Sequence, residues 1–485
     1  MQNIQDMKDL SNNAKDKIDK MTVANESRET FFKWLYLILM GLLLLSYPYM
    51  MLTYTYFVPY NIPIWIWVLR FSCAVLAIGL GKLWKDKGCW ILAVYFLWII
   101  LRMLIPDSKN LFSQQCSEVF ITGIWTFTAC YGMARILTPQ ELKRVLRICA
   151  AIWVLAMTIS STVGIIAAWQ DKRVYTWGNA AFWGIYPKRL MMPYLPTTSS
   201  ALTSFSSMVA LCALVCEKKR AIKILYGIAT AIITLALSLT DSRTGFISFA
   251  VGTAALIFVC LIWRQKSRVS YEQQKKTLKF RKFAVIIVTA MVVFAGTILV
   301  LMFAEREFHY LRVRGSLLIN NALAESTETE VFGRGFSGGT DMLTGRFELW
   351  IGTLKYLKQN PLVLLIGEGK IAPMNGIQKF TGHMLAHTHN MPLMILVESG
   401  IPGLLMVLAF VLYTARNYLK GFRAGMKLVP FILVSIILSI MAGDMVECFA
   451  WMQGSYLPLL QFMVFTAGIY NAIKSKTMIQ NGENI

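Results

Sequence analysis

Long apolar stretches dominate the chain and alternate with short polar segments. A helix of about 20 apolar residues crosses the hydrocarbon core of a bilayer, and about twelve stretches meet this length. They lie near 34–57, 64–81, 89–105, 116–134, 148–168, 198–216, 224–240, 246–263, 283–303, 391–415, 428–443 and 451–473. The pattern therefore predicts an all-α integral membrane protein of about twelve transmembrane helices.

One polar interval is much longer than the others, residues 304–387, between the ninth and tenth predicted spans. Glycine, serine and threonine crowd its 332–340 portion, which is typical of turns rather than of a spanning element. Apolar residues then recur at helical spacing up to the stop at Asn360-Pro361. They are Phe347, Trp350, Ile351, Leu354 and Leu357. The large loop is therefore predicted to be partly helical.

The distribution of lysine and arginine predicts the orientation, because cytoplasmic loops retain positive residues. One set of alternating short loops carries 23 Lys and Arg, and the opposite set carries 6. Both termini are then expected in the cytoplasm and the large loop outside. The predicted organisation is a cytoplasmic tail, helices 1–9, the outward loop, helices 10–12 and a second cytoplasmic tail. Their ranges are 1–33, 34–303, 304–387, 388–473 and 474–485.

Composition supports the membrane class and argues against nucleic-acid binding and against a disulfide framework. The chain is 56% hydrophobic and 15% charged, so the bilayer must be its solvent. A net charge of +22 is accounted for by the cytoplasmic loops, and no nucleic-acid partner is expected. The nine cysteines form no CxxC pair or regular metal spacing, which argues against a disulfide framework.

Three of the four histidines lie together, at His383, His387 and His389, just before the tenth predicted span. Imidazole transfers protons near neutral pH, so a general base for a sugar hydroxyl is one hypothesis. A polar cap at the membrane interface is a second. A metal site is a third, although there is no HExxH pattern and no nearby acidic ligand.

Four arginines fall on the predicted outward half of the membrane. They are Arg70, Arg102, Arg243 and Arg346. Guanidinium groups bind phosphate oxygens through paired, charge-assisted hydrogen bonds, so the set could hold a diphosphate. Snorkelling explains Arg102 better. A functional role is favoured for Arg243, although pairing with Asp241 is an alternative, and both interpretations stay open for Arg70, a charge inside a span.

Two further outward features have alternative interpretations. The 169–197 segment is rich in aromatic and basic residues, which suits sugar stacking but equally an ordinary interfacial aromatic belt. Asp444 and Glu447 precede the last predicted span, where they either help to bind an acceptor or are simply solvated.

Several motifs together resemble the bacterial O-antigen ligase and O-antigen polymerase superfamily. The first is His389-Asn390, nine residues, then Gly400-Ile-Pro-Gly403. Upstream motifs also resemble the large-loop pattern and the arginine turn of that family. They are Gly345-Arg346-Phe-Glu-Leu-Trp350, Asn360-Pro361, Ile366-Gly367-Glu-Gly369 and Ser242-Arg243-Thr244-Gly245. The motifs cover roughly 240–410, and the predicted topology extends the resemblance to nearly the whole chain.

The resemblance implies a GT-C-like enzyme of the cytoplasmic (inner) membrane that transfers a glycan from an undecaprenyl-diphosphate carrier to a glycan, lipid or protein acceptor. It implies no metal and no cofactor. His389 is then the base, with Arg243 and Arg346 on the diphosphate. The predicted substrate-binding residues are Arg70, Asn390, His387 and Trp350. The first outward loop, 58–63, has no acidic residue, so a catalytic carboxylate is not expected there.

A polytopic transporter or flippase of lipid-linked glycans is the rival class. Many carriers join two six-span halves by a long inner loop, whereas here the sixth and seventh predicted spans are joined by a very short one. Within the enzyme class, ligase and polymerase cannot be separated by these residues. The absence of any recognisable acceptor-specific feature favours polymerase slightly.

Overall fold

The computed structural model describes part of the chain at residue level. The described residues are 27–43, 45–46, 64–104, 122–170, 184–185, 190–192, 196–266, 280–319, 346–369, 377, 379–380, 388–423 and 428–447. The predicted twelfth span, residues 1–26 of the first predicted tail, the second predicted tail, most of the 169–197 segment, and His383 and His387 lie outside them.

The described residues are almost entirely helical. Residues 27–43 are helical, and a short 3-10 turn, η1 (Leu83–Lys85), follows the second span. The α-helices are α2 (Ile64–Gly81), α3 (Lys87–Leu104), α6 (Thr122–Ile136), α7 (Pro139–Trp169), α8 (Pro196–Cys216), α9 (Arg220–Leu239), α10 (Arg243–Lys266), α11 (Phe280–Ile319), α12 (Arg346–Gln359), α13 (Pro361–Ile366), α15 (Met391–Arg423) and α16 (Leu428–Asp444). One two-residue antiparallel pair joins β1 (Gly184–Ile185) to β2 (Leu190–Met191).

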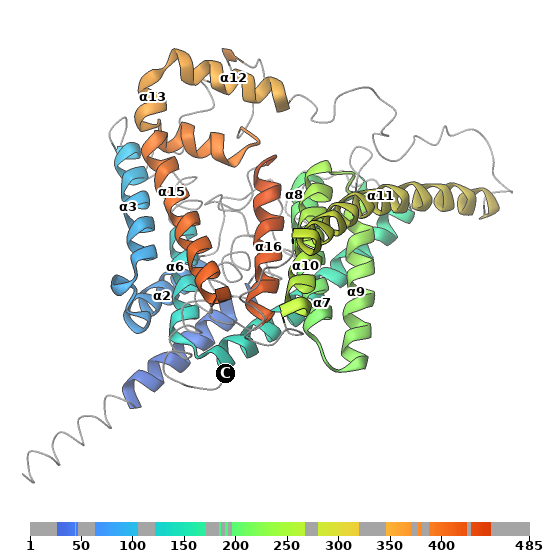
Figure 1. Cartoon of the computed structure of the whole chain (residues 1–485), viewed down its shortest axis with the longest axis horizontal. Helices are drawn as coiled ribbons and strands as arrows, with labels where there is room; N and C mark the ends of the chain where they lie inside the picture. The colour runs from blue at the N-terminus through green and yellow to red at the C-terminus, as the bar shows by residue number, and fades with distance from the viewer. Residues whose placement is uncertain are drawn as a thin grey trace, which may run out of the picture.

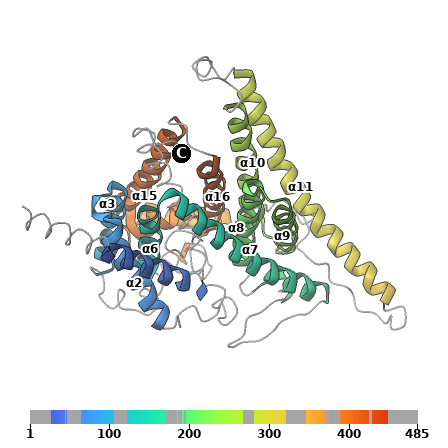
Figure 2. The ribbon, with the colours of Figure 1, turned by 90° about the horizontal axis from the view of Figure 1, so that it is seen from below.

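Eight helices in the described part of the chain are long and apolar enough to cross a membrane. They are α2, α3, α7, α8, α9, α10, α11 and α15, and α16 is a shorter apolar helix. In Figure 1, the axes of α3, α9, α10 and α16 are roughly aligned. Figure 2 shows α11 along the outer edge of the bundle, where little of its apolar surface is buried. The all-helical membrane class is thus confirmed, while the count of twelve remains a prediction.

Several helices continue beyond the predicted spans, because hydropathy marks only the apolar part of a helix. The span predicted at 283–303 lies within α11, which continues to Ile319 and makes the start of the predicted large loop helical. α7 starts nine residues before its predicted span, because Thr138 and Glu141 form a capping box. The Glu141 carboxylate also binds Lys33 at 2.8 Å.

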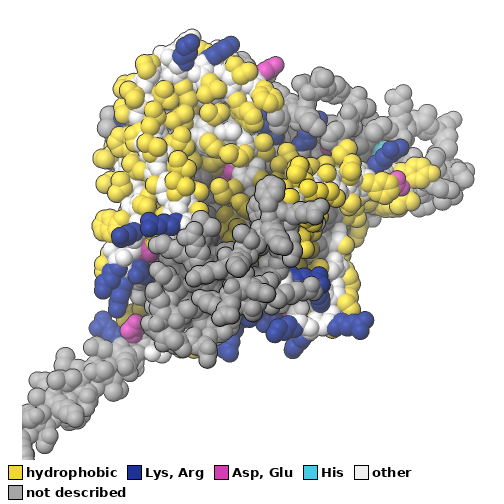
Figure 3. All heavy atoms as spheres, viewed as in Figure 1, with side chains coloured by type: hydrophobic (Ala, Val, Ile, Leu, Met, Phe, Trp, Pro, Cys, Tyr) yellow, Lys and Arg dark blue, Asp and Glu magenta, His cyan; other side chains and the backbone are white. Residues whose placement is uncertain are grey.

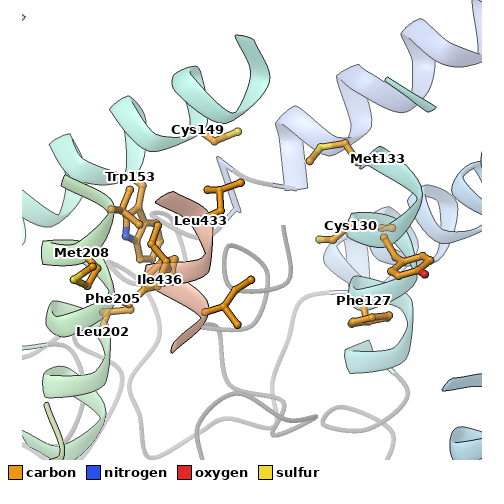
Figure 4. Close-up of a cluster of buried hydrophobic side chains, with 14 of the residues drawn as sticks. Phe127, Cys130, Met133, Cys149, Trp153, Leu202, Phe205, Met208, Leu433 and Ile436 are labelled. Atoms are coloured by element: carbon orange, nitrogen blue, oxygen red, sulfur yellow. The ribbon is translucent and has the colours of Figure 1, made fainter. Parts of the chain in front are cut away.

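An apolar core fills the space between α7, α8 and α16. Trp153 packs edge-on against Phe205 with ring centroids 6.2 Å apart, and its indole N–H donates to Ser206 Oγ at 2.9 Å. Figure 4 shows Trp153 and Phe205 turned toward Ile436 of α16. This contact joins helices that are distant in the sequence.

Buried hydroxyl groups join α10 to α16. Ser248 Oγ donates to the Ser439 carbonyl at 2.6 Å, and Ser439 Oγ donates to the Ser248 carbonyl at 2.8 Å. A polar group inside a membrane protein needs such a partner, because no water is present to replace it. The reciprocal pair fixes the start of α10 beside the end of α16.

The helix α15 is broken about two and a half turns after its start. Gly400 adopts φ 66° and ψ −170°, and Pro402 follows. Proline has no N–H, so the carbonyl four residues earlier, that of Glu398, loses its helical partner. Gly369 N–H donates to this carbonyl at 2.9 Å, and Glu368 N–H donates to the Val397 carbonyl at 2.9 Å.

The break therefore explains why two separate motifs belong together. The backbone of Gly367-Glu-Gly369 supplies donors for the carbonyls that Gly400-Ile-Pro402 leaves open. Trp98 Nε1 donates to the third carbonyl, that of Ser399, at 2.8 Å. Arg102, in turn, donates from Nε and Nη2 to the Gly367 carbonyl at 3.1 and 2.7 Å, so it holds the loop rather than snorkelling.

Candidate active site

His389 occupies a tight turn directly before α15. Its φ of 51° lies in the left-handed region, which histidine tolerates better than most residues. Asn390 is the helix cap: its Oδ1 accepts from Leu393 N–H at 2.9 Å. Thr388 Oγ1 donates to the Asn390 carbonyl at 2.8 Å. The turn thus places the imidazole beyond the helix end, 23% exposed.

The imidazole of His389 binds the carboxylate of Glu447 through Nδ1 and Oε1. Only 1% of the Glu447 side chain is exposed. A buried carboxylate needs a positive or donating partner, and here it has two. Its other oxygen, Oε2, accepts from Arg346 Nη2 at 2.9 Å. One carboxylate therefore binds both His389, the predicted base, and Arg346, a predicted ligand of the diphosphate.

Arg346 is the first residue of α12 and also reaches α10. Its Nη1 donates to Thr244 Oγ1 at 3.0 Å. Thr244 follows Arg243, which is the first residue of α10 and half-buried. The start of α10 and the start of α12 therefore meet near Glu447, the carboxylate that also binds His389.

Two contacts tie neighbouring segments to the His389 turn. Trp350 Nε1, one helical turn beyond Arg346, donates to the His389 carbonyl at 3.3 Å. Asn390 Nδ2 donates to the Met445 carbonyl at 2.8 Å. The first contact positions α12 and the second positions the segment that carries Glu447. Trp350 and Asn390 thus hold the site together through its backbone.

The structure does not join the two other predicted substrate residues to this cluster. Arg70 lies on α2, is 4% exposed, and no hydrogen bond or ion pair in the described part of the chain joins it to His389. Its Nε has no hydrogen-bond partner among the described residues. His387 lies outside the described residues, so its role stays a prediction.

The metal hypothesis depends on the same undescribed segment. Among the residues that the structure describes, no group of three or more His, Cys, Asp or Glu side chains could hold a metal ion. His383 and His387 are not among them. The described geometry gives His389 a carboxylate and a backbone contact instead.

Glu447 is the site residue that sequence reasoning missed. The sequence predicts an acceptor-binding or a solvated role for it, and it lies 58 positions from His389 and 101 from Arg346. The available signal was its place in the predicted outward turn before the last span, where an acidic residue could meet the outward histidine. The packing of α16 beside α10 and the contact of Asn390 with the Met445 carbonyl bring it there.

Residues 228–408 match the family model described as O-antigen ligase. The match places this segment in the O-antigen ligase superfamily. The resemblance seen in the sequence motifs is thereby confirmed, and no curated protein matches the chain. The O-antigen ligase segment contains Arg243, Arg346, His389 and the broken α15, whereas Glu447 lies beyond its end.

Proposed function

We propose that the protein is a membrane glycosyltransferase that uses an undecaprenyl-diphosphate-linked glycan as donor at the outer face of the cytoplasmic membrane. The family match supports an O-antigen ligase or polymerase type of membrane enzyme. The observation that carries the finer proposal is the arrangement of His389, Glu447 and Arg346 at the start of α15. The proposal retains both termini in the cytoplasm, about twelve spans and an outward large loop.

In the proposed step, an acceptor hydroxyl attacks the anomeric carbon of the donor sugar. The hydroxyl proton passes to Nε2 of His389, since Glu447 binds Nδ1 and favours the tautomer with its proton there. The bond from the anomeric carbon to the diphosphate oxygen breaks, and the diphosphate leaves with the electron pair. Glu447 then stabilises the imidazolium that forms.

Arg243 and Arg346 stabilise the leaving diphosphate. Negative charge grows on its oxygens in the transition state, where fixed cations lower the barrier most. In the resting site, Arg346 is paired with Glu447, so the diphosphate competes for the same guanidinium. Arg243 lies one residue from the Thr244 hydroxyl that Arg346 binds. If Arg243→Lys behaved like the wild type, a paired contact with the diphosphate would be excluded.

The experiment uses the full chain in lipid vesicles with lipid-linked repeat units. His389→Asn removes the base but retains a residue that tolerates the left-handed turn, so loss of transfer reports chemistry rather than folding. His309→Asn, on α11, is the matched control and should keep wild-type transfer. Transfer that survives His389→Asn would contradict the catalytic assignment.

The same preparation separates the remaining classes. A ladder of repeat units still attached to the carrier indicates a polymerase. Transfer only when an acceptor is added indicates a ligase. Movement of the lipid-linked unit across the bilayer that persists in His389→Asn, with no new glycosidic bond, would instead support the transporter class.

A further inference from the structure

α12 and α13 carry an apolar surface that the protein itself does not cover. Five side chains are each at least half exposed, and together they form what we call the outer ridge. They are Phe347, Ile351, Leu354, Leu362 and Leu365. The first three recur at helical spacing on one side of α12. These three residues belong to the apolar spacing that predicts the helix, and the structure shows that they are largely turned away from the core.

The opposite side of α12 has its own core. Leu349, Tyr356 and Leu357 are buried there with Ile377 and Val397 of other segments. α12 is therefore held in place without the outer ridge. A helix that is apolar on two sides and packed on only one needs a second apolar environment.

The surroundings of the outer ridge point to lipid as that environment. In Figure 1, α12 lies across the ends of α3 and α15, and α13 joins it to them. Arg102 at the end of α3 binds the Gly367 carbonyl that follows α13, and the nearby Leu101 and Leu104 of α3 are also exposed. Figure 3 shows hydrophobic side chains running from α12 and α13 onto α3. The outer ridge thus continues the apolar surface of a membrane span.

The charged residues of α12 fit the same environment. Lys355 and Lys358 are exposed on α12, beside the outer ridge. Figure 3 shows Lys and Arg side chains at the upper edge of this region, beyond the hydrophobic surface. Long lysine stems lie along apolar surface while the ammonium group reaches lipid phosphates, which is the usual arrangement of an interfacial amphipathic helix.

We propose that the outer ridge is immersed in the outer leaflet of the membrane, with Lys355 and Lys358 at the level of the lipid phosphates. α12 is then an interfacial helix rather than part of a soluble lid. Arg346 and Trp350 belong to this helix, so the depth of α12 in the membrane also sets the depth of these two residues. Under the proposed function, this places Arg346 at the depth where the diphosphate of a lipid carrier lies; the lipid contact itself does not depend on that function.

Photo-crosslinking of the full chain in nanodiscs tests the inference. A benzophenone amino acid replaces Ile351 on the outer ridge or Glu348, which is exposed at the polar edge of the same face, on the side of α12 that carries Lys355. Irradiation followed by mass spectrometry should give several times more phospholipid adduct at position 351 than at position 348. Equal adduct at the two positions, or a link from position 351 to a second copy of the chain, would overturn the inference.

The readout is independent of glycan transfer, so it distinguishes this inference from the proposed function. If the protein forms lipid adduct at position 351 but transfers no glycan from the lipid-linked donor, only the proposed function is contradicted. A second measurement uses Ile351→Lys, which keeps an exposed side chain but places a charge in the outer ridge. Lower transfer from the lipid-linked donor is expected, with an unchanged melting temperature in detergent. Unaltered transfer in nanodiscs would argue against the immersed depth.

Discussion

The buried carboxylate of Glu447 binds the imidazole of His389, although 58 positions separate the two residues. The same carboxylate accepts a hydrogen bond from Arg346. The predicted base and one predicted diphosphate ligand therefore share a single anion. Changes at Glu447 should affect proton transfer and donor binding together, which distinguishes a coupled site from two independent ones.

Glu447→Gln should lower kcat/KM for transfer by about ten- to a hundredfold. A hydrogen bond to a charged group contributes about 1.5–3 kcal/mol, and about 1.4 kcal/mol corresponds to a factor of ten. The neutral amide loses the ion pair with Arg346 and stabilises imidazolium poorly. The control is Glu348→Gln, on the exposed side of α12. Initial rates of transfer by the two variants in vesicles test the prediction. Equal rates for the two variants would contradict the role of Glu447.

Arg346→Lys should reduce kcat/KM for the lipid-linked donor about tenfold or more, because lysine cannot contact Thr244 and Glu447 through two separate nitrogens of a planar group. Donor titrations of the purified variant measure the loss. Arg306→Lys, an exposed position on α11, is the matched control. A similar loss in both variants would show that the effect is not specific to the site.

Asn390→Asp and Asn390→Ala should separate helix capping from site geometry. Aspartate still accepts from Leu393 N–H, so α15 keeps its cap, whereas alanine costs about 0.5–2 kcal/mol of stability. Neither variant donates to the Met445 carbonyl, and both should lose transfer activity. Melting temperatures and transfer rates are measured in parallel. Full activity in Asn390→Asp would mean that the Met445 contact does not position Glu447.

Gly400→Ala should destabilise the protein by about 1–3 kcal/mol, because its backbone conformation is open essentially to glycine alone. A Cβ would also lie 2.7 Å from Gly367 N. Gly296→Ala in α11 is the control: nothing lies within 4 Å of the added atom, and alanine favours helix. Thermal unfolding in detergent compares the two. A stable Gly400→Ala protein would exclude the strain described for the break in α15.

Glu368→Gln should raise the melting temperature at neutral pH. Burial raises the pKa of Glu368, and the attraction of Arg102 opposes this only in part. A pKa that is higher in the folded state means that the charged form destabilises the fold, so stability falls as pH rises through it. The advantage of glutamine should disappear below about pH 4, near the pKa of an unfolded glutamate. A lower melting temperature of Glu368→Gln at pH 7 would show that the Arg102 attraction outweighs burial.

Much of the fold followed from local properties of the sequence. The bounds of α2, α12 and α16 agree closely with the predicted elements, since helical spacing and stop signals are local. The length of α11 differs from the predicted span, because a helix can continue through polar residues. The orientation of α12 could not be predicted, because apolar spacing does not say which side meets the core. Sidedness and the twelfth span remain predictions.

The candidate site likewise combines features that the sequence predicts with features that only the tertiary structure shows. The sequence by itself determined the residue types with useful chemistry: a histidine before a span, and arginines at two motifs. Tertiary structure alone decided that Glu447 joins His389 to Arg346. The physical reason is that an ion pair depends on distance in space. The packing of α10 against α16, through the Ser248 and Ser439 contact, and the Asn390 contact with Met445 help to set those distances.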